Sequence, residues 1–140
     1  MTETTTETVR RLLAVVGRVK LNATTDFWKA PMSTLVECYN GTGPEWFPQG
    51  LRHVLDEVLQ LALPAVLIHD FDYSYNDGSL SKFEAANSRF YRNLRKLVAD
   101  AYPMADFMLI IPRLRWEFRA WILYKSCCDL GWCAYERGAK

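Results

Sequence analysis

Two short motifs in this chain hold residue types that can act together on an ester. A histidine stands beside an aspartate at His69 and Asp70, and Tyr73 follows one helical turn later. Upstream, residues 39–43 read Tyr-Asn-Gly-Thr-Gly, a loop of the kind that turns backbone carbonyls toward a hard cation. Histidine can take a proton from water, and a cation can stabilise the oxyanion on the carbonyl oxygen. The two motifs therefore predict calcium-assisted attack of water on an ester.

The spacing of the first motif suits a helix that begins near Pro64, because proline is favoured in the first turn. Neighbouring residues on a helix project about 100° apart, so His69 can face a water molecule while Asp70 faces an adjacent cation. Tyr73 comes four positions after His69 and returns to the same side.

The upstream segment is predicted to be an ordered loop. Residues 37–50 contain three glycines and two prolines, a density of helix breakers that forbids a regular helix. Calcium takes about six to eight oxygen ligands, and loops supply many of these as backbone carbonyls. Gly41 and Gly43 relax the backbone enough to aim such carbonyls inward.

In this order the two motifs resemble the Tyr-x-Gly-x-Gly loop and the His-Asp-x-x-Tyr helix of the phospholipase A2 family, including its compact viral members. The resemblance implies that the carbonyl oxygens of Tyr39, Gly41 and Gly43 bind calcium together with the carboxylate of Asp70. It also implies that the amide of Gly41 helps to hold the oxyanion and that His69 is the base.

The family also places an aspartate on the antiparallel partner helix, hydrogen-bonded to the base histidine and to tyrosine hydroxyls. Residues 85–90 are similar to the viral Ala-Asp-x-x-Phe pattern, but Asn87 stands at the position of the acid. The resemblance implies that Asn87 orients His69 and that Tyr73 braces Asn87. In a serine-protease triad, replacing the aspartate by asparagine lowers turnover about 10⁴-fold.

Two functions follow from this comparison. One is calcium-dependent hydrolysis of a glycerophospholipid acyl ester by a histidine-activated water. The other is a catalytically silent protein of the same fold that binds and inhibits a host protein. A late Tyr-Lys to Leu-Gly segment, residues 124–131, is similar to phage proteins of this type, so we expect a phage protein that acts in the host cytoplasm or in the virion.

Length and periodicity predict one all-α domain over residues 1–140. We expect a phospholipase A2-like arrangement, in which the calcium loop is followed by two antiparallel helices and further helices lie at both ends. Helical spacing indicates helices over residues 8–20, 51–62 and 114–135, and Ser81 with Glu84 indicates a capping box for the second of the antiparallel pair. The late aromatic residues, among them Phe118 and Trp121, are expected in the core or at a partner interface.

Charge and composition exclude several classes of protein. The net charge of +1 argues against a nucleic-acid binder, since such proteins need a clear excess of basic residues. Basic clusters around Arg89 and Arg115 are interpreted as solvated helix faces, with an anionic membrane surface as the alternative. The start of the chain does not have the pattern of a signal peptide, and no apolar run approaches the roughly 20 residues of a membrane span. The expected partner is a phospholipid surface or a host protein, and the sequence does not fix the oligomeric state.

Cysteine usage favours reduced thiols. There are four cysteines and no Cys-x-x-Cys pair, which disfavours a zinc site. A single bond from Cys38 to the late cysteines remains the alternative; these are Cys127, Cys128 and Cys133.

Overall fold

The described part of the chain is helical. The computed structural model describes residues 4–39, 49–103, 107–132 and 135–136, and the side chains of residues 49–59 are outside this description. These residues form α1 (Thr5–Val19), α2 (Thr25–Lys29), α3 (Met32–Cys38), α4 (Gln49–Ser74), α5 (Leu80–Ala101), the 3₁₀ helix η1 (Phe107–Leu109) and α6 (Ile110–Leu130). Within the same residues there is no β-strand, which confirms the all-α prediction.

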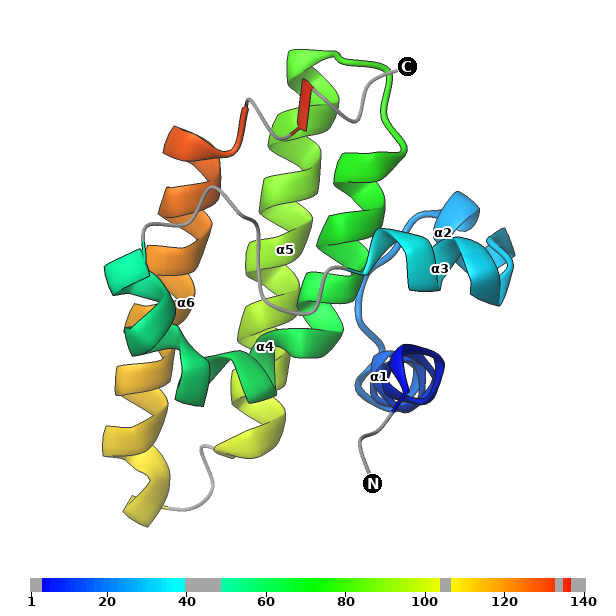
Figure 1. Cartoon of the computed structure of the whole chain (residues 1–140). Coiled ribbons are helices and arrows are strands. Elements are labelled where there is room, and N and C mark those ends of the chain that lie inside the picture. Colours follow the sequence, from blue (N-terminus) through cyan, green and yellow to red (C-terminus); the bar gives the residue numbers. More distant parts are fainter. Residues whose placement is uncertain (1–3, 40–48, 104–106, 133–134, 137–140) are drawn as a thin grey trace.

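Three long helices form the body of the molecule (Figure 1). α5 lies between α4 and α6 and packs against both, while α1 and α3 pack against α4 and against each other. The chain reverses between α4 and α5 and again between α5 and α6, so neighbouring helices run antiparallel. The predicted antiparallel pair is therefore α4 with α5.

The first helix shows how local sequence sets its bounds. The Thr4 side chain accepts a hydrogen bond from the backbone of Glu7, and Glu7 bonds back to the backbone of Thr4, which closes a capping box. This cap starts α1 three residues earlier than the apolar spacing predicts. Lys20 ends the helix in the left-handed conformation with φ 59°. Its buried face places Val9, Leu12 and Val16 in the core.

The second half of α4 is the centre of the core. From Ala62 to Ile68 every side chain is buried, including Pro64. A helix that is apolar on all sides is stable only when other elements cover it on all sides, and here α1, α3 and α5 do so. His69 directly follows this enclosed stretch and is itself buried.

The structure corrects several predicted boundaries. Pro64 does not begin a helix but lies inside α4, which changes direction along its length in Figure 1. A proline inside a helix removes a backbone hydrogen bond and bends the helix, and burial of the surrounding apolar residues offsets that cost. α5 is capped by Ser79 instead of Ser81, and α6 begins at Ile110, so that Pro112 falls in its first turn.

The predicted loop is shorter than expected. Glu37 and Cys38 complete α3, and Gln49 and Gly50 begin α4. Residues 40–48, which include Gly41 and Gly43, lie outside the described residues.

Two further findings concern the thiols and the lengths of the helices. Cys38, Cys127 and Cys128 are free cysteines, while Cys133 lies outside the described residues. Among the helices that the structure describes, none combines the length and the apolar character needed to span a membrane.

Candidate active site

His69, Asn87 and Tyr73 meet between α4 and α5. His69 Nε2 lies 3.0 Å from Asn87 Oδ1, and the Tyr73 hydroxyl donates to the same oxygen at 2.7 Å. All three side chains are buried, with exposed fractions of 3%, 1% and 8% respectively. The structure thus brings together three side chains that the family resemblance named in the sequence.

The turn between the two helices sets this alignment. Asn76 donates to the carbonyl oxygen of Tyr73 at 2.7 Å and accepts from the amide of Gly78 at 2.8 Å. Gly78 has φ 77°, a conformation that glycine adopts without strain, and Ser79 then caps α5. His69 and Tyr73 share one face of α4 because they are one turn apart, and the tight turn brings Asn87 opposite them.

Aromatic rings enclose the imidazole. The ring of His69 stacks on Phe90 with centroids 4.4 Å apart and lies 4.1 Å from the ring of Tyr73. Burial lowers the pKa of His69 to about 4, against the hydrogen bond to Asn87, and the positive charge of Arg89 lowers the pKa further. The imidazole is therefore neutral at pH 7.

The hydrogen bonds also fix where the imidazole proton lies. In this orientation of the amide Asn87 Oδ1 faces the ring and accepts, which assigns the hydrogen of His69 to Nε2. The lone pair of the neutral ring is then on Nδ1.

The amide at position 87 is only half satisfied. Its oxygen accepts from two donors, whereas Asn87 Nδ2 is buried with no hydrogen-bond partner in the described part of the chain. An unsatisfied buried donor costs about 1–3 kcal/mol. A carboxylate would keep both accepted bonds without this orphaned donor, so the position suits an acceptor better than an amide.

Asp70 lies close to the end of α3. Burial raises the pKa of the Cys38 thiol, a hydrogen bond with Ser74 lowers it, and the negative charge of Asp70 raises it again. Tyr39 follows Cys38 as the C-cap of α3. The fold therefore brings Asp70 near the point where the predicted calcium loop begins.

The donors near Asp70 are of the kind that calcium prefers. Asp70 is a half-buried carboxylate near Cys38, and a carboxylate is one of the two ligand types, with carbonyl oxygens, that calcium sites use. Gly41 and Gly43, the other two predicted ligands, lie outside the described residues. Among the residues that are described, no group of three or more His, Cys, Asp or Glu side chains could hold a metal ion.

Sequence reasoning missed one charged pair beside the site. Asp72 on α4 and Arg89 on α5 form an ion pair, and Asp72 is only 8% exposed. Burial raises the pKa of Asp72 to about 6, although Arg89 opposes this shift. The spacing held a signal, since Asp72 comes three residues after His69 and Arg89 two after Asn87, so the pair crosses the same helix interface.

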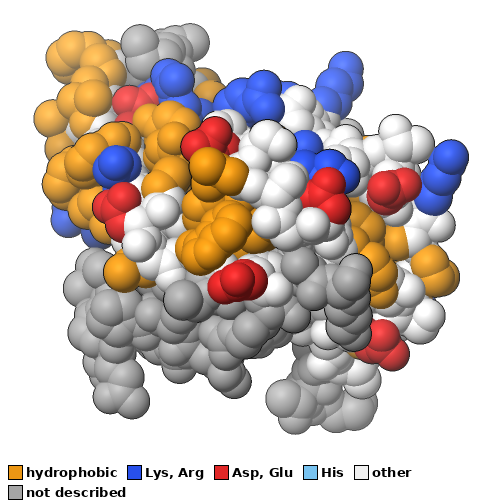
Figure 2. Space-filling model, turned by 90° about the horizontal axis from the view of Figure 1, so that it is seen from above, with side chains coloured by type: hydrophobic (Ala, Val, Ile, Leu, Met, Phe, Trp, Pro, Cys, Tyr) orange, Lys and Arg blue, Asp and Glu red, His pale blue; other side chains and the backbone are white. Residues whose placement is uncertain are grey.

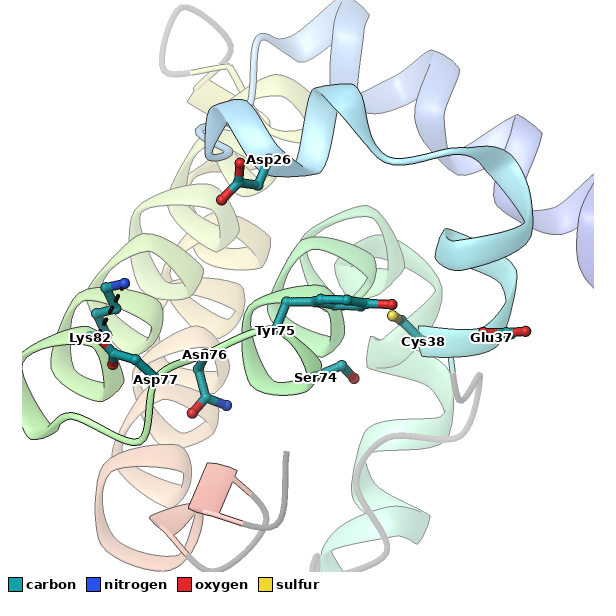
Figure 3. A pocket seen from close by; sticks show the side chains of 8 residues that line it. All are labelled: Asp26, Glu37, Cys38, Ser74, Tyr75, Asn76, Asp77 and Lys82. Atoms are coloured by element: carbon teal, nitrogen blue, oxygen red, sulfur yellow. Dashed lines mark ion pairs between the residues drawn. The ribbon is translucent and has the colours of Figure 1, made fainter. Parts of the chain in front are cut away.

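A cleft of about 540 Å³ opens next to this interface (Figure 3). It lies where the ends of α3 and α4 approach α2 and the start of α5, and Tyr75 points across it toward Cys38. Among the described residues, eight side chains line it: Asp26, Glu37, Cys38, Ser74, Tyr75, Asn76, Asp77 and Lys82. A smaller hollow of about 150 Å³ adjoins it and includes Asp72 and Arg89. His69 lines neither space.

Comparison with protein-family models, with curated proteins and with solved structures finds no match to this chain.

Proposed function

We propose that this protein hydrolyses an acyl ester of a glycerophospholipid, with His69 as the general base and calcium as the cofactor. The observation that supports this proposal is the convergence of His69 Nε2 and the Tyr73 hydroxyl on Asn87 Oδ1, at 3.0 and 2.7 Å. That arrangement leaves Nδ1 of a neutral imidazole as the only basic nitrogen of the ring.

In the proposed reaction Nδ1 of His69 takes a proton from a water molecule as the water attacks the ester carbonyl. The imidazolium that forms keeps its Nε2 hydrogen bond to Asn87, so the ring does not turn during the transfer. Tyr73 holds the amide oxygen of Asn87 in place from the other side. The proton then passes to the leaving alkoxide, and no covalent intermediate is formed.

The calcium ligands are proposed from the resemblance together with the position of Asp70. The carboxylate of Asp70 and the carbonyl of Tyr39 would hold the ion, with Gly41 and Gly43 completing the set and the amide of Gly41 aiding the oxyanion. When bound, calcium supplies the positive charge that stabilises negative charge on the carbonyl oxygen.

Asn87 limits the rate that this site can reach. A carboxylate would stabilise the imidazolium by its charge, whereas a neutral amide only orients it. A base whose pKa is about 4 is also weak at neutral pH. We therefore expect slow turnover compared with a site that holds an aspartate.

The test is release of fatty acid from mixed phospholipid vesicles by the purified protein, with calcium or with a chelator. Calcium-dependent release that is lost in His69→Ala would establish both the activity and its base. Asn87→Ala should also abolish release. The matched control is Asn93→Ala, because Asn93 is likewise a fully buried amide on α5, yet it bonds the backbone of Asn22 and does not touch His69.

The second candidate is a silent protein of this fold that binds and inhibits a host protein. The presence of Asn87 where the family has an acid favours it. No release by folded protein on any lipid mixture would leave this candidate, and capture of a defined protein from host lysate would then be the next experiment. The phage origin and the place of action in cytoplasm or virion stay predictions.

A further inference from the structure

We infer that the outer face of α6 docks the protein on an anionic phospholipid surface. Five large apolar side chains along this side are exposed, one on η1 and four on α6, and we call them the α6 stripe. Their exposed fractions are Phe107 81%, Ile111 66%, Leu114 56%, Phe118 62% and Trp121 47%. Exposure of one such residue is ordinary, but a contiguous row of them marks a binding surface.

The stripe is continuous because of its spacing. Its four members on α6 are separated by steps of three, four and three residues, which returns each side chain to the same side of the helix, and Phe107 on η1 precedes them by four residues. The opposite side of α6 buries Ala120, Leu123 and Cys127 in the core. α6 is thus apolar on two opposite sides, and the described part of the chain covers only one of them. Met108, 80% exposed, extends the apolar surface at the start of the stripe.

The charges on α6 favour lipid over protein as the occupant. Between residues 110 and 130 four side chains are basic and two are acidic. Arg113 is engaged by Glu117 at 3.3 Å, whereas Arg115 and Lys125 are exposed next to the stripe. A second copy of α6 would bring the same basic residues with it, and like charges would repel. An anionic lipid surface complements them.

Side-chain chemistry points the same way. Interfacial helices combine aromatic and aliphatic residues on the inserted face with arginine and lysine on the flanks. Long basic side chains can keep their charge at the head groups while their stems cover apolar surface. Arg119 makes a different contact, since its guanidinium lies over the ring of Trp116, 5.5 Å from the ring centroid. In Figure 2 apolar and basic side chains are mixed at the left edge of the molecule, the side on which α6 lies in Figure 1.

This inference rests on the proposed function for the choice of a lipid, and it adds the surface by which the protein would reach that lipid. Binding through α6 needs neither His69 nor calcium. Docking and hydrolysis can therefore be measured separately.

The test is co-sedimentation with phosphatidylcholine vesicles, with and without phosphatidylglycerol, in the presence of chelator. Phe118→Glu is compared with Leu80→Glu, because Phe118 and Leu80 are 62% and 60% exposed and both variants change the charge equally. Leu80 begins α5, at the end of that helix remote from the start of the stripe. We expect wild type to bind the anionic vesicles. Phe118→Glu should lower the partition about tenfold or more, and Leu80→Glu by less than about twofold.

Phe118→Ser, which adds no charge, should show the same loss with an unchanged helical circular dichroism spectrum. Vesicle binding without any hydrolysis would support docking through α6 and would contradict only the proposed enzymatic activity. Equal partition of wild type and Phe118→Glu would overturn the inference. So would a wild-type dimer in sedimentation velocity that Phe118→Glu dissociates while no vesicles are bound, since the stripe would then join two copies of the chain.

Discussion

Asn87 is the residue on which the chemistry of this site depends. Its oxygen receives two hydrogen bonds, and its nitrogen has no partner in the described structure. The surroundings of position 87 thus resemble a carboxylate site occupied by an amide. Burial leaves His69 neutral and weakly basic, with a pKa of about 4, because the hydrogen bond to the uncharged amide raises that pKa too little to offset burial.

Asn87→Asp should therefore increase hydrolysis. A negative charge 3.0 Å from Nε2 favours the imidazolium, so the pKa of His69 should rise. In wild type the active neutral form should persist as pH falls, and the acid limb of the pH–rate profile should lie near pH 4. In Asn87→Asp that limb should move to higher pH while the plateau rises. Asn93→Asp is the matched control and should shift neither. Loss of activity in Asn87→Asp would mean that the site requires the amide.

The ion pair between Asp72 and Arg89 predicts a pH-dependent stability effect. Arg89→Ala leaves a buried carboxylate without its partner, which costs about 3–5 kcal/mol where the carboxylate is ionised. The folded pKa of Asp72 is already raised to about 6 and should rise further in the variant. Because a raised carboxyl pKa makes the native state bind its proton more tightly, stability is lost as pH rises and regained as pH falls to about 4.

Urea unfolding at pH 4 and at pH 7 measures this effect. The control is Arg18→Ala, whose ion pair with Asp100 has side chains 62% and 40% exposed and should contribute at most about 1 kcal/mol at either pH. An equal loss in Arg89→Ala at both pH values would show that the arginine stabilises by packing rather than by its charge.

At the scale of elements, the C-terminal end of α6 touches the site. A Cβ atom added at Gly131 would lie 2.5 Å from the Tyr73 hydroxyl and 2.5 Å from the carbonyl oxygen of Cys127. The backbone of Gly131 is right-handed, with φ −82°, so lack of space and not backbone strain requires glycine there. α6 thus helps to position Tyr73, and through it Asn87.

Gly131→Ala should destabilise the protein by about 1–3 kcal/mol through overpacking, and it should lower hydrolysis because the Tyr73 hydroxyl must move. Gly17→Ala is the matched control. Its Cβ would meet no atom within 4 Å, and alanine inside α1 should stabilise by about 0.5–1 kcal/mol. Thermal unfolding and fatty-acid release give both quantities. Wild-type activity in Gly131→Ala would show that α6 does not position Tyr73 for hydrolysis.

The elements also show how far sequence reasoning reaches. Helical spacing predicted α1, and Ser81 with Glu84 predicted the start of α5 to within two residues, because both signals are local. The predicted helix start at Pro64 was wrong, because core burial offsets the cost of a proline inside a helix and no local pattern reveals that burial. The short helices α2 and α3 were missed because five and seven residues carry too little periodicity. The meeting of His69 with Asn87 came from a family resemblance and not from spacing.

At the scale of the whole molecule, a calcium ion bound as proposed would connect two segments that are distant in the sequence. Asp70 belongs to the buried core helix, and Tyr39 ends α3. An ion held between them would link α3 to α4 in the native state only. Ligands that bind only the native state stabilise it by mass action, about 2.7 kcal/mol at one hundred times the dissociation constant.

Millimolar calcium should therefore raise the melting temperature by several degrees, on the order expected for a few kcal/mol in a domain of this size. Asp70→Asn should remove that shift while the protein without calcium stays folded. Asp100→Asn is the control, because Asp100 is an exposed carboxylate near the far end of α5 whose partner is Arg18. A shift that survives Asp70→Asn would place the ion elsewhere. No shift in the melting temperature of wild type would argue against a calcium site. The role of His69, which bonds Asn87 together with Tyr73, would then be tested by the hydrolysis assay alone.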